Sequence, residues 1–428
     1  MKLSKTFVGF GFGPIQSGLF LYEAYASGNF SRFVVAEVDA AVVQAVRANG
    51  QRYRINIARK DRIDCCELEG IEIYNPRVPA DRRAIVEAVA ASDELATCLP
   101  SVKFYDAGQD TSVARMIAEG LSGRTKAMPT IVYAAENHNH AAELLREAVG
   151  KHDPGLPRRP VEMLNTVIGK MSGIIADCEV IERMGLATAT PGIGRAVLVE
   201  EFNRILISRV TLPGCRRGIE VFAEKADLLP FEEAKLYGHN AVHALIAYLS
   251  DLKGLETIAQ AGGDIRIMRT AHDAFLKESG AALIRRHAGL GDPLFTPEGY
   301  RHYAEDLLER MVCPNLNDLV SRVGRDHVRK LAFDDRLFGT MDLALQAGIE
   351  PVNLALGAAA GVVSMIRRRS ELPADVAHLP ERPADLTVEG LRRLLLGLWG
   401  PRADRNAEAM VRLTWQALEQ LRQDGWMQ

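Results

Sequence analysis

The first 39 residues follow a pattern that few folds accommodate. Residues 6–10 are short, apolar and β-favouring, and they run directly into a glycine-rich turn at 11–18. A helical stretch at 19–26 follows, and then a second strand at 32–39 that ends in acidic residues. A strand-turn-helix-strand unit of this size is typical of a mononucleotide-binding half of a doubly wound parallel sheet. The pattern therefore predicts a Rossmann-like domain at the start of the chain.

The same unit predicts a cofactor. Gly11 and Gly13 would let the backbone approach a pyrophosphate, and the helix that follows would present free N–H groups to it. Glu37 stands where a carboxylate would bind the ribose hydroxyls of adenosine and repel a 2′-phosphate, which favours NAD over NADP. The third position of the G-x-G-x-x-G motif is Gln16, so a strand-turn-helix without a ligand is the alternative.

Further strands and helices continue through the first half of the chain. The strand at 130–135 ends on Glu136-Asn137, and carboxyl ends of parallel strands border the ligand crevice. Asn137 is therefore predicted to meet the nicotinamide or the substrate. His138 and His140 lack a third ligand at a diagnostic spacing, so we expect a solvated helix start and no metal. Other segments expected in this half are the N-cap Asp39 with its helix 40–48, strands 71–74 and 94–100, and helix 81–91.

The second half of the chain has a different periodicity of apolar residues. From residue 231 onward nearly every segment has helical periodicity and strand-like runs are scarce. A chain of 428 residues is also too long for one ordinary core. We therefore expect an α/β plus all-α protein, with a Rossmann-like doubly wound domain over 1–195 and a helical substrate domain over 196–428. The helices expected in the second half are 232–251, 265–286, 297–312, 318–330, 337–348, 351–368, 388–399 and 404–424.

One helix of the second half carries a chemical pattern, K-x4-N-x2-H. On an α-helix Asn240 would lie roughly 140° and His243 roughly 80° around from Lys235, so the three share less than half the circumference. An amine that can lose its proton, a carboxamide that donates and an imidazole suit proton transfer to or from an alcohol oxygen. A solvated polar face of the helix is the alternative.

Composition excludes several classes of protein. A formal net charge of −3 argues against a nucleic-acid binder that works by bulk charge. No apolar run approaches the roughly 20 residues of a membrane span, and no leader-like segment opens the chain. The six cysteines show no metal-like clustering and indicate free thiols in a reducing compartment. We expect a cytoplasmic protein without a membrane partner.

Four stretches carry a shared set of motifs: the turn Gly11-x-Gly13-Pro14-Ile15-x-x-Gly18, the pair Glu136-Asn137, the helix Lys235-x4-Asn240-x2-His243, and the segment 322–331 followed by 334–337. Together they resemble the mannitol dehydrogenase family, the polyol-specific long-chain dehydrogenases. The last stretch is very similar to the mannitol-1-phosphate 5-dehydrogenase branch of that family. The resemblance spans about residues 5–370.

The resemblance implies a function and roles. It implies an NAD-dependent, metal-independent dehydrogenase acting on a secondary alcohol of a sugar alcohol or polyol phosphate, as a monomer or homodimer. Lys235 would be the general base, which requires its pKa to fall toward neutrality. Asn240 and Asn165 would stabilise the developing alkoxide, and His243 would hold substrate hydroxyls or orient Lys235.

Departures from the family pattern leave the substrate open. Gln16 replaces a glycine, Ala135 replaces a cysteine, and the segment 165–170 lacks the usual acidic-arginine pair. A sugar-acid oxidoreductase that acts on hexuronates or hexonates, or an NAD-binding sensor without catalysis, are the alternatives. Cations that could bind a substrate phosphate, although each also suits an ordinary ion pair, are Arg216, Arg217, Arg325, Arg329 and Lys330.

Overall fold

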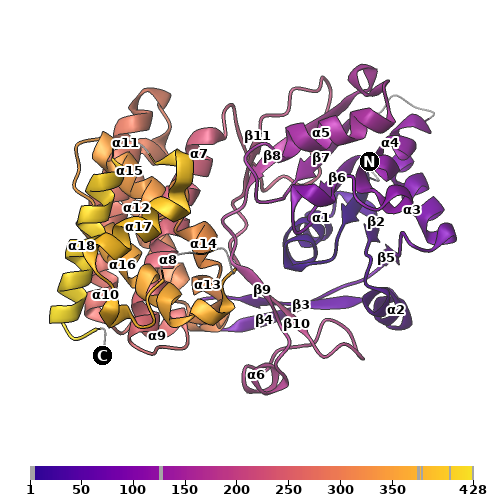
Figure 1. The fold of residues 1–428 in the computed structure, drawn as a ribbon. Helices are drawn as coiled ribbons and strands as arrows, with labels where there is room; N and C mark the ends of the chain where they lie inside the picture. The colour runs from indigo at the N-terminus through magenta and orange to yellow at the C-terminus, as the bar shows by residue number, and fades with distance from the viewer. Residues whose placement is uncertain (1–4, 125–128, 374–375, 377–378, 404–405, 427–428) are drawn as a thin grey trace. The chain divides into compact units, whose positions relative to one another are not determined.

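The computed structural model describes residues 5–124, 129–373, 376, 379–403 and 406–426. The chain divides into two compact units, Met1–Leu229 and Pro230–Gln428 (Figure 1). The first is α/β and the second is helical, so the predicted fold class is confirmed. The boundary lies later than the expected 195/196, because residues 196–229 contribute three strands to the sheets of the first unit.

The first unit is built on an eight-stranded sheet in the order β12-β11-β8-β7-β6-β1-β2-β5. The six strands from β8 to β5 are parallel, and along the chain their order is the 3-2-1-4-5-6 of a dinucleotide-binding sheet. β11 pairs antiparallel with β8. The strands are β1 Lys5–Phe10, β2 Phe30–Ala36, β5 Ile71–Tyr74, β6 Glu94–Thr97, β7 Thr130–Ala134, β8 Val161–Val167, β11 Leu206–Ser208 and β12 Ala223–Lys225.

Alternate residues of the central strands supply two separate cores. Phe7 and Val35 belong to the core on one face of the sheet, whereas Val8 and Val34 belong to the core on the other. Helices cover both faces, which explains why the strands are apolar almost throughout (Figure 1). The helices of this sheet are α1 Leu21–Ser27, α2 Ala40–Ala48, α3 Pro79–Ala91, α4 Val113–Ser122 and α5 Ala141–His152.

A second, four-stranded sheet was not predicted. Its order is β4-β3-β10-β9, and no element is expected from the sequence over 49–69, where β3 and β4 form a hairpin. β4 includes Asp64 and Glu67 and is buried only at its last residue, so its apolar signal is weak. The strands are β3 Tyr53–Ala58, β4 Ile63–Leu68, β9 Ser172–Ile175 and β10 Ala196–Glu200. The connection from β9 to β10 contains the small helix α6 Cys178–Arg183 (Figure 1).

The second unit is a helical domain centred on α8 and α16. Both helices are buried almost all round, and a Cβ at Gly357 of α16 would lie 2.8 Å from Leu245 of α8, so glycine allows their close approach. The expected helix 318–330 is broken in two at Asp326, whose φ is 65°. The α-helices and π-helices of the second unit are α7 Leu229–Glu233, η5 Ala234–Asn240, α8 Ala241–Leu252, α9 Ile258–Ala261, α10 Ile265–Asp273, η6 Ala274–Gly280, α11 Ala281–His287, α12 Pro297–Met311, α13 Val320–Gly324, α14 His327–Lys330, α15 Phe338–Gln346, α16 Val352–Arg367, α17 Val388–Trp399 and α18 Ala407–Gln423. Within the described ranges, no helix has the length and apolar character needed to cross a membrane.

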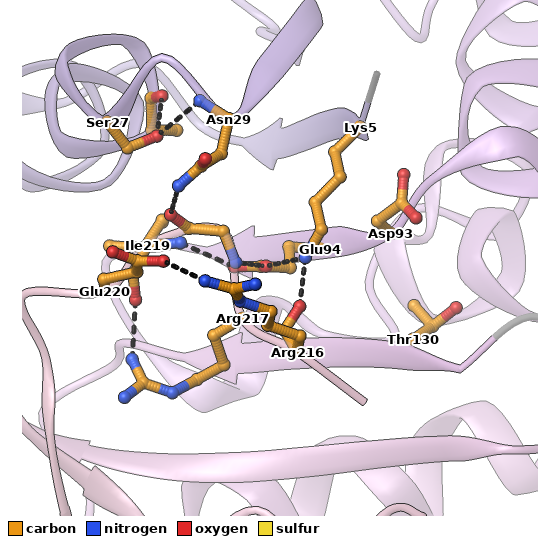
Figure 2. Close-up of polar contacts among 12 residues, drawn as sticks. Lys5, Ser27, Asn29, Asp93, Glu94, Thr130, Arg216, Arg217, Ile219 and Glu220 are labelled. Atoms are coloured by element: carbon orange, nitrogen blue, oxygen red, sulfur yellow. Dashed lines mark hydrogen bonds and ion pairs between the residues drawn. The ribbon is translucent and has the colours of Figure 1, made fainter. Parts of the chain in front are cut away.

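A buried carboxylate anchors the amino edge of the large sheet (Figure 2). Glu94 Oε1 lies 3.3 Å from Lys5 Nζ, and Glu94 Oε2 accepts the Tyr133 hydroxyl at 2.9 Å. Glu94 also accepts the N–H of Gly218, whose carbonyl accepts the Asn29 amide at 2.8 Å. Segment 216–219 is thereby fixed across the amino ends of β1 and β6.

Two of the candidate phosphate-binding cations, Arg216 and Arg217, belong to the segment that Glu94 holds. Arg217 donates to Glu224 at 2.9 Å and to the carbonyls of Ile219 and Phe222, and Arg216 forms an exposed ion pair with a neighbouring glutamate. Both lie at the amino edge of the sheet, whereas ligands of such sheets bind at the carboxyl edge. They are therefore unsuited to bind a substrate phosphate beside the glycine turn.

We predict that Glu94→Ala lowers the free energy of unfolding by about 3–5 kcal/mol, because the buried Lys5 amine loses its carboxylate. Urea unfolding followed by circular dichroism measures the change. Glu220→Ala is the control: it removes an exposed ion pair with Arg216 and should stay within about 0.5 kcal/mol of the parent protein. Equal effects of the two substitutions would contradict the assignment of Glu94 as the anchor.

Candidate active site

The glycine turn lies at the carboxyl end of β1, next to β6. Gly11 has φ 87°, and a Cβ there would lie 2.8 Å from the Cys98 carbonyl oxygen, so only glycine fits. A Cβ at Gly13 would meet no heavy atom within 4 Å, so the space above this residue is open. The helix starts at Pro14 and Ile15, and its N–H groups at this end lack intrahelical partners.

The departure at Gln16 is accommodated inside the protein. The helix continues from Ile15 as the π-helix η1 Gln16–Phe20, and the Gln16 side chain is fully buried over Gly9 of β1. A Cβ at Gly9 would lie 2.2 Å from Gln16 Nε2, so the absent side chain at residue 9 makes the room. The close approach of helix and neighbouring strand falls instead on Gly18, where a Cβ would lie 2.4 Å from Val199. The substitution therefore leaves the open side of the turn unchanged.

Glu37 follows the last residue of β2. One of its carboxylate oxygens accepts the Asp39 N–H at 2.8 Å, and Asp39 caps α2 as predicted. The side chain of Glu37 is half-buried. Glycine turn, helix start and half-buried carboxylate together fit an adenine dinucleotide.

Glu136 belongs to one of the sequence motifs, but its role could not be predicted from sequence. Its carboxylate is buried and accepts the Thr97 hydroxyl at 2.9 Å, the Leu99 N–H at 2.8 Å and the Tyr105 hydroxyl. Burial raises the pKa of Glu136, and these hydrogen bonds act in the opposite direction. The residue holds the loop after β6 in place and leaves Asn137 exposed next to it.

Asn165 is engaged within the first unit. Its Oδ1 accepts the Ala142 N–H at 2.8 Å, and its Nδ2 donates to Glu143 at 2.8 and 3.1 Å. The side chain therefore fixes the start of α5, and its donor is already used. The two histidines before α5 are exposed, and His138 Nδ1 accepts the His140 N–H at 3.1 Å. In the part of the chain that the structure describes, no three His, Cys, Asp or Glu residues are grouped to hold a metal ion.

The K-x4-N-x2-H pattern does not lie on a regular α-helix. Lys235 and Asn240 both belong to the π-helix η5, and His243 lies in the first turn of α8. A π-helix bonds residue i to residue i+5, so Asn240 follows Lys235 by about one turn. The two side chains are thus closer in angle than the roughly 140° expected of an α-helix.

Neighbouring helices supply the partners that the π-helix needs. The Tyr237 carbonyl accepts the Ser279 hydroxyl at 2.8 Å and the Thr340 hydroxyl at 3.1 Å, so this oxygen is satisfied without an α-helical bond. Gly238 allows the close approach, because a Cβ there would lie 2.7 Å from the Tyr300 hydroxyl. Tertiary contacts, rather than the local sequence pattern, therefore set the register of this segment.

The surroundings of Lys235 favour the neutral form of its amine. Burial lowers the pKa of Lys235 to about 8; the Glu232 carboxylate opposes this shift, and the Arg336 guanidinium adds to it. The pKa thus moves toward neutrality, as a general base requires. Arg336 was not among the predicted site residues, and its signal in sequence is only its place in segment 334–337.

His243 has a carboxylate partner, Asp318, that was not expected from the sequence. His243 Nε2 lies 3.1 Å from Asp318 Oδ2, and Asp318 Oδ1 accepts Nε and Nη2 of Arg322 at 2.9 and 2.6 Å. Burial alone would raise the pKa of Asp318, but His243 and Arg322 lower it below its usual value. The i, i+4 spacing of Asp318 and Arg322 was visible in the sequence, whereas the contact with His243 was not.

The remaining phosphate candidates lie on or beside α14. Arg329 forms ion pairs with Asp326 and Asp335, while Arg325 is exposed. Lys330 is buried and donates to a backbone carbonyl, and burial lowers its pKa to about 7. The charges of Arg329 and Arg325 also lower the pKa of Lys330, so the three cations lie within electrostatic range of one another although their other contacts differ.

Comparisons with known proteins agree with the motifs. The model of the mannitol dehydrogenase C-terminal domain matches residues 227–368. The mannitol-1-phosphate 5-dehydrogenase of Shouchella clausii is 30% identical over 353 residues, which is 81% of this chain and 85% of that protein. The same enzyme from Exiguobacterium sibiricum is 28% identical over 355 residues, 83% of this chain and 84% of that protein.

Two solved structures share the fold. A D-sorbitol dehydrogenase in substrate-free form has a TM-score of 0.77 at 16% identity and covers 100% of this chain and 95% of its own. The ternary complex of Pseudomonas fluorescens mannitol 2-dehydrogenase with NAD and D-mannitol has a TM-score of 0.67 at 16% identity, over 99% and 93%. The family model and the sequence relatives confirm the resemblance drawn from the motifs.

We predict that Gly238→Ala disrupts the π-helix, because its Cβ would collide with Tyr300 and Phe275. The expected loss is about 1–3 kcal/mol of stability, measured by thermal or urea unfolding. Gly397→Ala is the matched control, since a Cβ at this exposed position of α17 meets nothing within 4 Å. It should be neutral or stabilise by up to about 1 kcal/mol. If Gly238→Ala were as harmless as the control, the close packing of η5 would be wrong.

Proposed function

Because this chain belongs to the mannitol dehydrogenase family of oxidoreductases, we propose that it is an NAD-dependent dehydrogenase of a sugar alcohol or polyol phosphate. It transfers a hydride between NAD and a secondary alcohol. The observation that carries the proposal is the Lys235 amine, with a pKa of about 8 and Asn240 one π-helical turn away. The names of the relatives, mannitol-1-phosphate 5-dehydrogenases, and the NAD and D-mannitol of the fold relative support cofactor and substrate class.

The first unit binds the cofactor. Gly11 and Gly13 leave the turn open to the pyrophosphate, and the helix that begins at Pro14 and Ile15 directs its free N–H groups there. Glu37 accepts hydrogen bonds from the ribose hydroxyls, and exposed Asn137 contacts the nicotinamide side or the substrate. When bound, NAD accepts the hydride in alcohol oxidation and returns it in the reverse direction.

The second unit moves the proton. Neutral Lys235 takes the proton of the reacting hydroxyl, and with a pKa of about 8 roughly a tenth of the amine is neutral at pH 7. Asn240 donates a hydrogen bond to the developing alkoxide, and His243 binds hydroxyl groups of the polyol. Asn165 is left out of this group because its amide already donates to Glu143. An amine base needs no metal ion for this transfer.

A substrate panel tests the proposal. NADH formation is followed with polyols, polyol phosphates and hexonates, with NAD and NADP in parallel. Turnover of a polyol or polyol phosphate with NAD supports it. Turnover of hexonates alone would identify a sugar-acid oxidoreductase, and NAD binding in a thermal-shift assay without turnover of any compound would identify a sensor. Either of these results would replace the proposed function.

We predict that Lys235→Ala lowers kcat for alcohol oxidation about 10²–10⁴-fold while NAD affinity stays unchanged. In the parent enzyme kcat should rise about tenfold per pH unit up to about pH 8 and then level off, because only the neutral amine is a base. Lys277→Ala removes an exposed lysine and should leave both rate and profile intact. Full activity of Lys235→Ala would refute the base assignment.

We predict that Glu37→Ala weakens NAD binding about tenfold or more, because a charged hydrogen-bond partner of the ribose is lost. NADP use should improve at the same time, because the repulsion of its 2′-phosphate is removed. The ratio of kcat/KM for the two cofactors measures both effects. Glu179→Ala on exposed α6 serves as the control, and an unchanged cofactor ratio in Glu37→Ala would contradict the assignment.

A further inference from the structure

Two buried polar atoms of the second unit face each other. His243 Nε2 lies 3.1 Å from Asp318 Oδ2, and the two side chains are only 12% and 4% exposed. Neither atom has a hydrogen bond of regular geometry to a described residue, so their 3.1 Å approach is a close electrostatic contact. The imidazole and the carboxylate are therefore each other's polar partner at this point.

The carboxylate is held rigidly by its surroundings. Asp318 Oδ1 accepts two N–H groups of Arg322, and the Asp318 carbonyl accepts the Ile258 N–H at 2.8 Å. The adjacent Leu319 forms an antiparallel β-bridge with Thr257. Side chain and backbone are thus both fixed, and Oδ2 remains for the imidazole alone.

We propose that Asp318 is a positioning residue that keeps the proton of neutral His243 on Nε2, so that Nδ1 accepts a hydrogen bond from a substrate hydroxyl. A neutral imidazole has one N–H, and a carboxylate opposite one nitrogen places the proton there. The other nitrogen then has a lone pair, which suits a hydroxyl that donates. This inference rests on the proposed function, in which His243 binds the hydroxyls of the polyol.

The Arg322 ion pair alone does not account for the second oxygen. It uses Oδ1, whereas Oδ2 contacts only His243. Asp318→Asn separates the two roles, because the amide has nearly the same size and can keep its oxygen toward Arg322. Its NH₂ group would then face Nε2 and favour the opposite tautomer, in which Nδ1 carries the proton and repels a donating hydroxyl.

The first test reads the tautomer directly and needs no activity. Two-bond ¹H–¹⁵N correlation spectra of the full chain with ¹⁵N-labelled histidine distinguish the two tautomers, and His243→Gln assigns the signal. We expect the Nε2-protonated form in the parent protein and a shift to the Nδ1-protonated form in Asp318→Asn. An Nδ1-protonated parent, or the same tautomer in both proteins, would overturn the proposal whatever the substrate is.

The second test is kinetic, with D-mannitol 1-phosphate and D-mannitol as probes. Asp318→Asn should raise KM for the turned-over probe about tenfold or more while kcat and NAD affinity change less than about threefold. In a His243→Gln background it should add no further loss, as expected of a residue that acts through His243. A further loss in that background, or an unchanged KM, would overturn the proposal.

A matched variant controls for the loss of a carboxylate. Asp306 pairs with Arg310 at 3.0 Å with the same i, i+4 spacing, but it is exposed on α12. Asp306→Asn should leave tautomer, KM and melting temperature unchanged. If neither probe is turned over by the parent protein, the proposed function fails on that ground, and the tautomer spectra still decide the role of Asp318.

Discussion

The proposed site depends on the amine of half-buried Lys235, whose surroundings disfavour its charged form. Burial moves the pKa of Lys235 to about 8, and this would be of little use if Asn240 pointed elsewhere on the helix. Lys235 and Asn240 both belong to the π-helix η5, and the Tyr237 carbonyl of this helix accepts hydroxyls from two other helices. Acidity of the amine and placement of the amide thus have one cause, which is the packing of η5 against its neighbours.

Much of the architecture follows from periodicity. The apolar strands, the glycine turn and the acidic strand end were sufficient to predict the parallel sheet, and the 3.6-residue period located the helices of the second half to within a few residues. Chemically distinctive residues were also recognisable, because lysine, asparagine and histidine at a fixed spacing are informative by type alone. Asp39 as the cap of α2 is a case where local chemistry decided the outcome.

What sequence could not supply depends on contacts between distant residues. The contact of His243 with Asp318 joins two segments that have helices α9 to α12 between them in the chain. The hydrogen bonds of Asn165 to the start of α5 depend on how β8 lies beside this helix. The hairpin of β3 and β4 was missed because its outer strand is polar on one side. The α-helical geometry predicted for Lys235 to His243 was wrong because it depends on distant contacts. An α-helix is the local default, and neighbouring side chains override it in η5.

The anchor at the amino edge of the sheet has a consequence for biosynthesis. Lys5 and Arg216 are in contact although 211 residues separate them along the chain. A nascent chain that has already made β1 and β6 still carries the Glu94 carboxylate without the backbone N–H groups of residues 218 and 219. The nucleotide-binding sheet is therefore completed late on the ribosome, shortly before the first helices of the second unit emerge.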